Sequence, residues 1–463
     1  MPFSTQEAIC REASRHSRPL TRDRLVAYFA QGCKPASEQK VGVEWEKLGV
    51  YRDTGRAIAY SGPRGVEAIF TALSVRYGWQ PVIASGHIIA LKKNTTTITL
   101  EPGGQIELSG WKATTLDENA SELYSHLDEI EQVSVPLGIA WLGLGAQPLS
   151  TADEIEWVPK ERYAIMRESL KGRGELTYSM MKETASVQIS VDYISERDAA
   201  EKLRLALGLS PLLAALFANS PLWRGQAAPY LSRRSQIWLG TDPARTGLIR
   251  RAFEPGFGFE AYTDFALEVP LLFLVRGERW QPVHGITFGD FLKHGYDGKC
   301  ATLADWELHL TSLFTEARLK HYVEIRSIDC QKTDLGLSAV ALLKGVFYDP
   351  VSRGQAWELV GDLSWEERLR LASEVPARGL KTRWRGATLH QAALQLLQWG
   401  EEGLQRLSAH QLALEDESKY LAPLKELIQN RGLTPAEALL QCLNLGADGQ
   451  STVENIIRCA ALR

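Results

Sequence analysis

The sequence predicts an α+β fold in which an antiparallel sheet packs against helices through one of its faces. Apolar and polar residues alternate in four separated segments, so each segment has one apolar and one polar side. One uncovered polar side is typical of antiparallel sheets, because parallel sheets are covered by helices on both faces. A series of helix signals after residue 355 predicts a helical C-terminal region.

The four strand segments are residues 41–50 (VGVEWEKLGV), 97–110 (TITLEPGGQIELSG), 186–193 (SVQISVDY) and 322–326 (YVEIR). In the first segment, Glu44 and Glu46 point to one side while Val43 and Trp45 point to the other. The other segments alternate in the same way. Along the four polar sides we find Glu44, Glu46, Glu101, Glu107, Gln188, Glu324 and Arg326.

Helix starts are marked by the Ser/Thr-x-x-Glu capping pattern. It occurs three times, at Thr115 with Glu118, Ser364 with Glu367, and Thr434 with Glu437. After the first start, Leu123, Leu127 and Ile130 recur at helical spacing, which predicts a buried stripe. The segment 199–217 is apolar nearly all round and predicts a buried helix.

The length and the composition limit the class of protein. With 463 residues, the chain is long enough for one large domain or for about two to three average ones. Its net charge of −4, with both signs interspersed, argues against a nucleic-acid or anionic-membrane partner. No apolar run approaches the roughly 20 residues of a membrane-spanning helix. We expect a lead over residues 1–19, a catalytic sheet domain over 20–354, and a helical region over 355–463 that packs on the same domain.

The six cysteines are widely scattered and form no CxxC pair. This spacing argues against a zinc site and favours reduced thiols. The N-terminal stretch lacks the apolar core of a secretion signal, so we expect a cytoplasmic enzyme. The cysteines are Cys10, Cys33, Cys300, Cys330, Cys442 and Cys459.

The polar sides of the strands predict a cation site. If the segments lie side by side, five glutamates share one surface, where like charges destabilise one another unless a cation neutralises them. Carboxylate oxygens without a Cys or His cluster favour Mg²⁺, which in such sites commonly binds nucleotide phosphates. The sequence has no GxxxxGK[ST] loop and no GxGxxG motif after a strand, so ATP would be bound at this sheet together with Mg²⁺. For any single glutamate, a merely solvated position remains the alternative.

Arginines are the second expected component, because a guanidinium group binds carboxylates and phosphates through paired hydrogen bonds. Arg326 is the strongest candidate, since it lies two residues from Glu324 on the same side of a strand. The other candidates are Arg162, Arg167, Arg233, Arg234 and Arg245.

Several long motifs, in order along the chain, resemble the plant-type glutamate–cysteine ligases of the glutamine-synthetase-like superfamily. They include GVEWEKLGV, LEPGGQIELSG, ERYAIMR, LSRRSQIW, TDFALEVP, GITFGDFL and RLKHYVEIR. The resemblance extends from about Leu20 to about Ala438, almost the whole chain. It implies a curved antiparallel funnel with helices on its outer face, and ATP and Mg²⁺ on the inner face.

The resemblance also implies roles for individual residues. Arg326 resembles the arginine that faces the transferring phosphate, and Arg162 and Arg234 match those that bind the carboxylates of glutamate. Arg167, Arg233 and Arg245 are weaker candidates. The residues that resemble the metal-binding set are Glu44, Glu46, Glu101, Glu107, Gln188 and Glu324.

The implied reaction joins the γ-carboxylate of glutamate to the amine of cysteine through a γ-glutamyl phosphate, the first step of glutathione biosynthesis. Cysteine as the acceptor rests on the resemblance alone, so a γ-glutamyl ligase with another amine acceptor is the alternative. A second alternative is a non-catalytic binding protein that has this fold. We expect a monomer or a weak homodimer with small-molecule substrates.

The chain departs from the family pattern at two positions. Trp45 replaces a histidine of the first strand, and alternation turns it away from Glu44 and Glu46, so we expect a change in packing alone. Val283 stands where the plant members have the first cysteine of a regulatory hairpin disulfide. We therefore expect that this redox switch is absent and that activity does not depend on a reductant.

Overall fold

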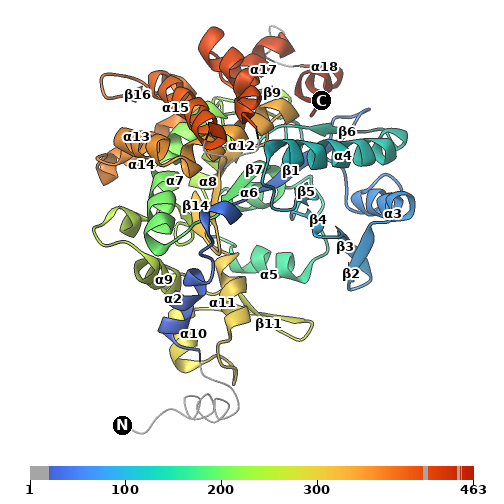
Figure 1. Cartoon of the computed structure of the whole chain (residues 1–463). Helices are drawn as coiled ribbons and strands as arrows, with labels where there is room; N and C mark the ends of the chain where they lie inside the picture. Colours follow the sequence, from blue (N-terminus) through green and yellow to red (C-terminus); the bar gives the residue numbers. More distant parts are fainter. Residues whose placement is uncertain (1–19, 410–414, 446–448, 450) are drawn as a thin grey trace, which may run out of the picture.

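The structure is a computed structural model that describes residues 20–409, 415–445, 449 and 451–463. The predicted lead, residues 1–19, lies outside the described residues. Figure 1 shows the strands of the main sheet in the middle of the molecule, with α4 and α12 on one side of the sheet and α5 on the other. The helices of the C-terminal third lie at one end, and α2, α10 and α11 lie at the opposite end (Figure 1).

The main sheet has the strand order β14-β15-β7-β1-β5-β4-β3-β2, with β6 paired to β1 in addition. Every one of these pairs is antiparallel, which confirms the predicted α+β fold. The strands are β1 (Val41–Tyr51), β2 (Gln80–Ala84), β3 (His87–Lys93), β4 (Thr96–Leu100), β5 (Ile106–Ser109), β6 (Ile139–Leu142), β7 (Ser186–Val191), β14 (Ala317–Leu319) and β15 (Val323–Asp329). Short strands outside the main sheet are β8 (Leu222–Trp223), β9 (Gln226–Ala227), β10 (Thr246–Gly247), β11 (Phe273–Arg276), β12 (Arg279–Pro282), β13 (Phe314–Thr315), β16 (Arg383–Trp384) and β17 (Ala387–Thr388).

The four predicted strand segments all belong to the main sheet, but the second one is a hairpin of two strands, β4 and β5. Its turn is closed by hydrogen bonds from Glu101 N to Gln105 O and from Gly104 N to Glu101 O, each of 2.9 Å. Gly104 has φ +83°, a left-handed conformation that favours glycine. The turn therefore holds Glu101 at the end of β4.

Helices cover the apolar face of the sheet. They include α4 (Leu116–Ser134), α7 (Glu196–Leu216) and α12 (Thr333–Tyr348), and α7 is the helix predicted over 199–217. Trp45 is buried on this face, as alternation predicts. Its ring packs on α12, where a Cβ on Gly336 would lie only 2.7 Å from the ring. Glycine at position 336 therefore makes room for the tryptophan.

All three predicted capping boxes are present, at the starts of α4, α14 and α17. Two further boxes use aspartate, with Thr287 and Asp290 before α10 and Thr302 and Asp305 before α11. The other helices are α2 (Arg22–Ala30), α3 (Val66–Tyr77), α5 (Glu161–Ser169), α6 (Thr177–Glu183), α8 (Arg233–Leu239), α9 (Phe259–Glu268), α10 (Phe288–His294), α11 (Leu303–Leu310), α13 (Pro350–Val360), α14 (Trp365–Arg378), α15 (Leu389–Ala409), α16 (Ala422–Lys425), α17 (Pro435–Leu443) and α18 (Val453–Ala460).

The last third of the described chain is mostly helical, as predicted. The boundary placed between residues 354 and 355 falls inside α13, and one hydrophobic core contains residues from both sides of it. The division into two regions remains a prediction.

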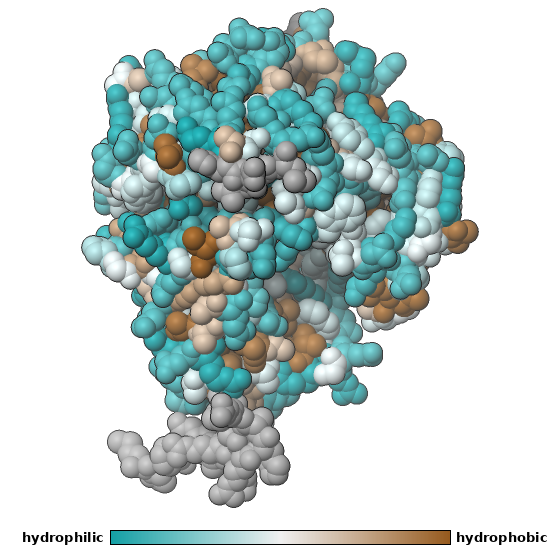
Figure 2. Space-filling model, in the orientation of Figure 1, coloured by the Kyte–Doolittle hydropathy of each residue, from teal (hydrophilic) through white to brown (hydrophobic). Residues whose placement is uncertain are grey.

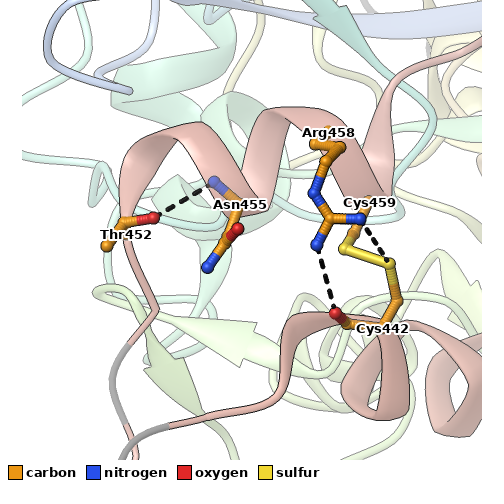
Figure 3. Close-up of a disulfide and its surroundings, with 5 residues drawn as sticks. All are labelled: Cys442, Thr452, Asn455, Arg458 and Cys459. Atoms are coloured by element: carbon orange, nitrogen blue, oxygen red, sulfur yellow. Dashed lines mark hydrogen bonds between the residues drawn. A yellow bond between two sulfur atoms is a disulfide. The ribbon is translucent and has the colours of Figure 1, made fainter.

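The cysteines differ from the expected reduced state. Cys442 and Cys459 form a disulfide with a Cα–Cα distance of 5.9 Å (Figure 3), and Cys300 is also disulfide-bonded. Cys33 and Cys330 are free thiols, while Cys10 lies outside the described residues. The prediction of reduced thiols is therefore wrong for three cysteines. Cys442 and Cys459 meet because α17 and α18 pack together, which the spacing of cysteines in the sequence does not reveal.

The disulfide joins α17 to α18, whose last turn is attached to the main sheet. Beyond α18, Leu462 N donates to Trp141 O of β6 at 3.2 Å, and Thr333 N donates to Leu462 O at 3.0 Å. The Arg458 guanidinium donates to Cys442 O at 3.4 Å (Figure 3). The bond therefore restrains the C-terminal segment beside β6.

Removing this bond is expected to lower stability without touching the sheet. The cysteines are 17 residues apart, and closing a loop of that size stabilises a fold by about 3 kcal/mol. The double variant Cys442→Ser/Cys459→Ser should unfold at a lower urea concentration than the wild type. The Cys33→Ser variant is the matched control, because it replaces a free thiol and leaves this disulfide intact. Equal midpoints for the double variant and the wild type would contradict a stabilising role.

The surface facing the viewer in Figure 2 is mostly hydrophilic, with small, separate hydrophobic patches. Within the described ranges, no helix combines the length and the apolar character that crossing a membrane requires.

Candidate active site

The strand register brings the predicted donor residues to one face of the sheet. Glu46 of β1 lies opposite Glu107 of β5, and Glu44 of β1 lies opposite Gln188 of β7. Side chains opposite one another on neighbouring strands are about 4.5–5.5 Å apart at Cβ. The hairpin turn after β4 adds Glu101 beside them. Glu44 and Gln188, 144 positions apart in the sequence, thus become direct neighbours.

These residues line a cavity of about 290 Å³. The predicted site residues on its wall are Glu44, Glu46, Glu101, Glu107, Gln188, Arg162, Arg234 and Arg326. Of the residues to which the resemblance assigns a role, Glu324 alone does not line it.

Crowding and burial of the carboxylates affect their protonation. Burial, together with the charges of Glu107 and Glu324, raises the pKa of Glu44 to about 8. Burial also raises the pKa of Glu46, with further contributions from Glu101 and Glu107. Negative charge on this face is therefore only partly compensated by the protein itself.

A hydrogen-bond network fixes part of this face. The Glu46 carboxylate accepts from Ser186 N at 2.6 Å and from Gln188 Nε2 at 2.8 Å. Arg326 donates to Gln188 Oε1, and to Glu324 Oε1 at 2.9 Å. Glu44, by contrast, has no hydrogen bond to its carboxylate among the described residues.

Glu324 is fully buried and is surrounded by cations. Arg318 donates to both of its oxygens, from Nε at 2.6 Å and from Nη2 at 2.8 Å, and Lys320 Nζ lies 3.1 Å away. Burial alone would raise the pKa of Glu324, but the charges of Arg318, Lys320 and Arg326 hold it well below its usual range. Glu324 is thus an ionised carboxylate whose oxygens are already paired, and its role as a metal ligand remains a prediction.

Arg162 and Arg234 line the cavity from two different helices, α5 and α8. Arg162 of α5 donates from Nη2 to Thr311 Oγ1 at 3.1 Å, and its buried Nε has no hydrogen-bond partner. Arg234 of α8 donates from Nη2 to Arg326 O at 2.8 Å, and its Nη1 lies 3.8 Å from Asp329. Both side chains line the cavity, and each guanidinium has donors that these contacts do not use and that could bind an anionic substrate.

The three weaker arginine candidates lie elsewhere. Arg167 is exposed and lies over the Trp157 ring at 5.3 Å. Arg233 forms a buried ion pair with Glu183 at 2.5 Å, and Arg245 forms one with Asp242 at 2.9 Å. None of the three lines the cavity.

Sequence reasoning missed two cationic residues of the cavity wall, Lys160 and Arg318. Lys160 Nζ donates to Leu100 O at 2.9 Å, and burial lowers its pKa to about 8. Lys160 could have been identified from the sequence, because it lies two residues before Arg162 in the PKERYAIMR motif. Arg318 is the first residue of the RLKHYVEIR motif, but its pairing with Glu324 depends on the β14–β15 register, which the sequence does not show.

The donor set has the right chemistry for Mg²⁺, which prefers carboxylate and amide oxygens. The raised pKa values of Glu44 and Glu46 indicate carboxylates that a cation would stabilise. In the described part of the chain, however, no three Asp, Glu, His or Cys side chains converge closely enough to hold a metal ion. The residue types therefore fit the metal, whereas the carboxylates are not drawn together around one point.

Oxygen donors beside several buried arginines suit an enzyme that handles anionic substrates, and this is the class of protein that the fold and the site define. A family model described as glutamate-cysteine ligase family 2 (GCS2) matches residues 40–460, and the chain belongs to this family.

Among curated relatives, the chloroplastic glutamate–cysteine ligase B of Oryza sativa subsp. japonica is 38% identical over 432 residues, which are 93% of this chain and 85% of the relative. The chloroplastic glutamate–cysteine ligase of Arabidopsis thaliana is 38% identical over 443 residues, 95% of this chain and 83% of the relative. A solved glutamate–cysteine ligase from Francisella tularensis, in complex with AMP, has a TM-score of 0.54 and 13% identity, and the match covers 91% of this chain and 87% of that one. At that identity the likeness shows the fold alone.

These matches confirm the predicted family and, with it, the predicted enzyme, a glutamate–cysteine ligase. The cytoplasmic prediction is wrong by the same comparison, because these relatives are named as chloroplastic enzymes. A compartment is set by targeting signals that receptors read, so the composition and fold of an enzyme do not encode it.

Proposed function

We propose that the cavity of about 290 Å³ is where the γ-carboxylate of glutamate is joined to the amine of cysteine, with ATP as the activating substrate. The observation that carries this proposal is the meeting of five oxygen donors and three predicted arginines at one cavity, in a chain of the glutamate–cysteine ligase family. The direct test is ATP turnover with glutamate and a panel of amino acids and amines. Cysteine should be the preferred acceptor, and equal turnover with unrelated amines would favour the alternative acceptor.

In this proposal, the arginines position the two anionic substrates. Arg162 and Arg234 bind the carboxylates of glutamate through their free guanidinium donors. Arg326, which the sheet holds beside Gln188, faces the phosphate that moves from ATP to the γ-carboxylate. The resulting γ-glutamyl phosphate is attacked by the cysteine amine, and phosphate leaves. A cavity wall of buried residues limits loss of this intermediate to water.

The residues proposed to hold Mg²⁺ are Glu44, Glu46, Glu101, Glu107 and Gln188, with Glu324 as a sixth. Bound there, Mg²⁺ would neutralise charge on the nucleotide phosphates. Glu324 could join only by giving up contacts to Arg318 and Lys320. The oligomeric state, a monomer or a weak homodimer, remains a prediction.

Replacing Arg234 by alanine is expected to weaken glutamate binding. Losing one partner of a buried, charged hydrogen bond costs about 2–5 kcal/mol, so the KM for glutamate should rise at least about 30-fold. The KM for ATP should change little. Steady-state kinetics with each substrate varied in turn measures both values.

The matched control is Arg167→Ala, which removes an exposed arginine of the neighbouring α5 that does not line the cavity. It should leave both KM values unchanged. An unchanged KM for glutamate in Arg234→Ala would remove Arg234 from the proposed site.

A further inference from the structure

A carboxylate that the proposed mechanism does not use, that of Glu316, lies beside the active-site cavity. Glu316 connects β13 to β14. Its backbone is fixed on both sides, because Glu316 N donates to Gly247 O and Arg326 N donates to Glu316 O, each at 3.0 Å. The sheet therefore fixes the position of Glu316 relative to Arg326.

Glu316 lines a small side cavity of about 10 Å³. This is room for about one water-sized group. Arg234, Trp238, Phe314 and Arg326 line both this side cavity and the main cavity, so the two adjoin. A small polar group of a substrate in the main cavity could enter the side cavity, whereas a whole amino acid could not.

The Glu316 carboxylate has no partner of its own. Nowhere in the described ranges does it accept a hydrogen bond or form an ion pair. The neighbouring guanidinium groups donate elsewhere, that of Arg234 to Arg326 O and that of Arg326 to Gln188 and Glu324. Burial raises the pKa of Glu316, and the charges of Arg234 and Arg326 lower it. A half-buried carboxylate that lines a cavity and has no partner can still accept a donor, which favours a binding role over a structural one.

We propose that Glu316 binds the ammonium group of an amino-acid substrate in this side cavity. An ammonium group is about the size of a water molecule and carries three hydrogen-bond donors. The rings of Trp238 and Phe314 on the wall would also favour a cation. The proposal rests on the proposed function, because it takes Arg234 as the group that binds a substrate carboxylate next to the ammonium.

Two substrates carry this chemistry, glutamate through its α-ammonium and the acceptor through its amine. The side cavity adjoins both Arg234, proposed to bind glutamate, and Arg326, proposed to face the reacting phosphate. The shared ligand is therefore a primary ammonium group, and the experiment has one arm for each source.

The test is the variant Glu316→Gln, which keeps the size of the side chain and removes its charge. In the glutamate arm, the kcat/KM for glutamate is compared with that for glutarate, which lacks the α-amine. If Glu316 binds the α-ammonium, the preference for glutamate should fall about tenfold or more in the variant. In the acceptor arm, the KM for cysteine should rise by a similar factor, while the glutamate preference is kept.

Glu168→Gln is the matched control, since Glu168 is exposed and does not line either cavity. The melting temperature of neither variant should fall below that of the wild type. A Glu316→Gln enzyme with an unchanged glutamate preference and an unchanged KM for cysteine overturns the proposal. If the wild type itself forms no product from ATP, glutamate and any amine, the proposed function fails instead, before the variants are compared.

Discussion

Replacing Arg326 by alanine is expected to lower kcat at least about 1000-fold, the largest effect of any single substitution in this enzyme. Arginines that face a transferring phosphoryl group contribute about 10³–10⁵ to kcat, since they stabilise charge that develops only in the transition state. Arg326 suits that role because its side chain is largely buried and its guanidinium is held in place by Gln188 and Glu324. The measurement is kcat at saturating ATP, glutamate and cysteine.

Arg326→Lys should recover part of the loss, because it restores the charge without the planar pair of donors. Arg279→Ala, which removes an exposed arginine of β12, is the control and should behave as the wild type. If Arg326→Ala instead raised KM values with kcat intact, Arg326 would be a binding residue without a transition-state role.

The variant Glu44→Gln is expected to lose at least about 100-fold in activity, because in the proposed mechanism it lacks a metal ligand that contributes several kcal/mol of charge stabilisation. The same change should stabilise the metal-free enzyme at alkaline pH. Glu44 is the suitable carboxylate for this test, since none of the described residues donates a hydrogen bond to it. Activity and stability are thus predicted to move in opposite directions.

The pH dependence follows from the pKa of Glu44, which folding raises from 4.5 to about 8. Between these values the unfolded chain has lost the proton that the folded chain keeps. The folded state therefore becomes less stable as pH rises, by up to about 1.4 kcal/mol per pH unit for this group. Glutamine does not ionise, so the melting temperature of Glu44→Gln should exceed that of the wild type at pH 8 and approach it near pH 5. If the variant were less stable than the wild type at pH 8, the ionised Glu44 carboxylate would not be destabilising, and the explanation by charge crowding would be wrong.

The catalytic face could be predicted from the sequence to the extent that it depends on local alternation. The period of two placed Glu44 and Glu46 on the face opposite Trp45, and the register then placed Glu107 and Gln188 opposite them. Arg318 and Glu316 could not be found in this way, because their significance comes from which strands and helices lie beside them.

The disulfide likewise could not be predicted from the sequence. Cys442 and Cys459 are joined because α17 and α18 are neighbours in the fold, and nothing in their separation of 17 residues distinguishes them from free thiols. Residue periodicity predicts the faces of elements, while the contacts between elements require the fold itself.

The register of the sheet has a consequence for the folding of the chain during its synthesis on the ribosome. Gln188 bonds to a residue 142 positions earlier, and Arg326 bonds to Gln188 across another 138 positions. Such distant pairings fold slowly, since long loops must close before the contacts form. A nascent chain that ends before β15 lacks Arg326, the arginine proposed to face the transferring phosphate. In the proposed mechanism, ATP turnover therefore requires more than two-thirds of the chain to have been made.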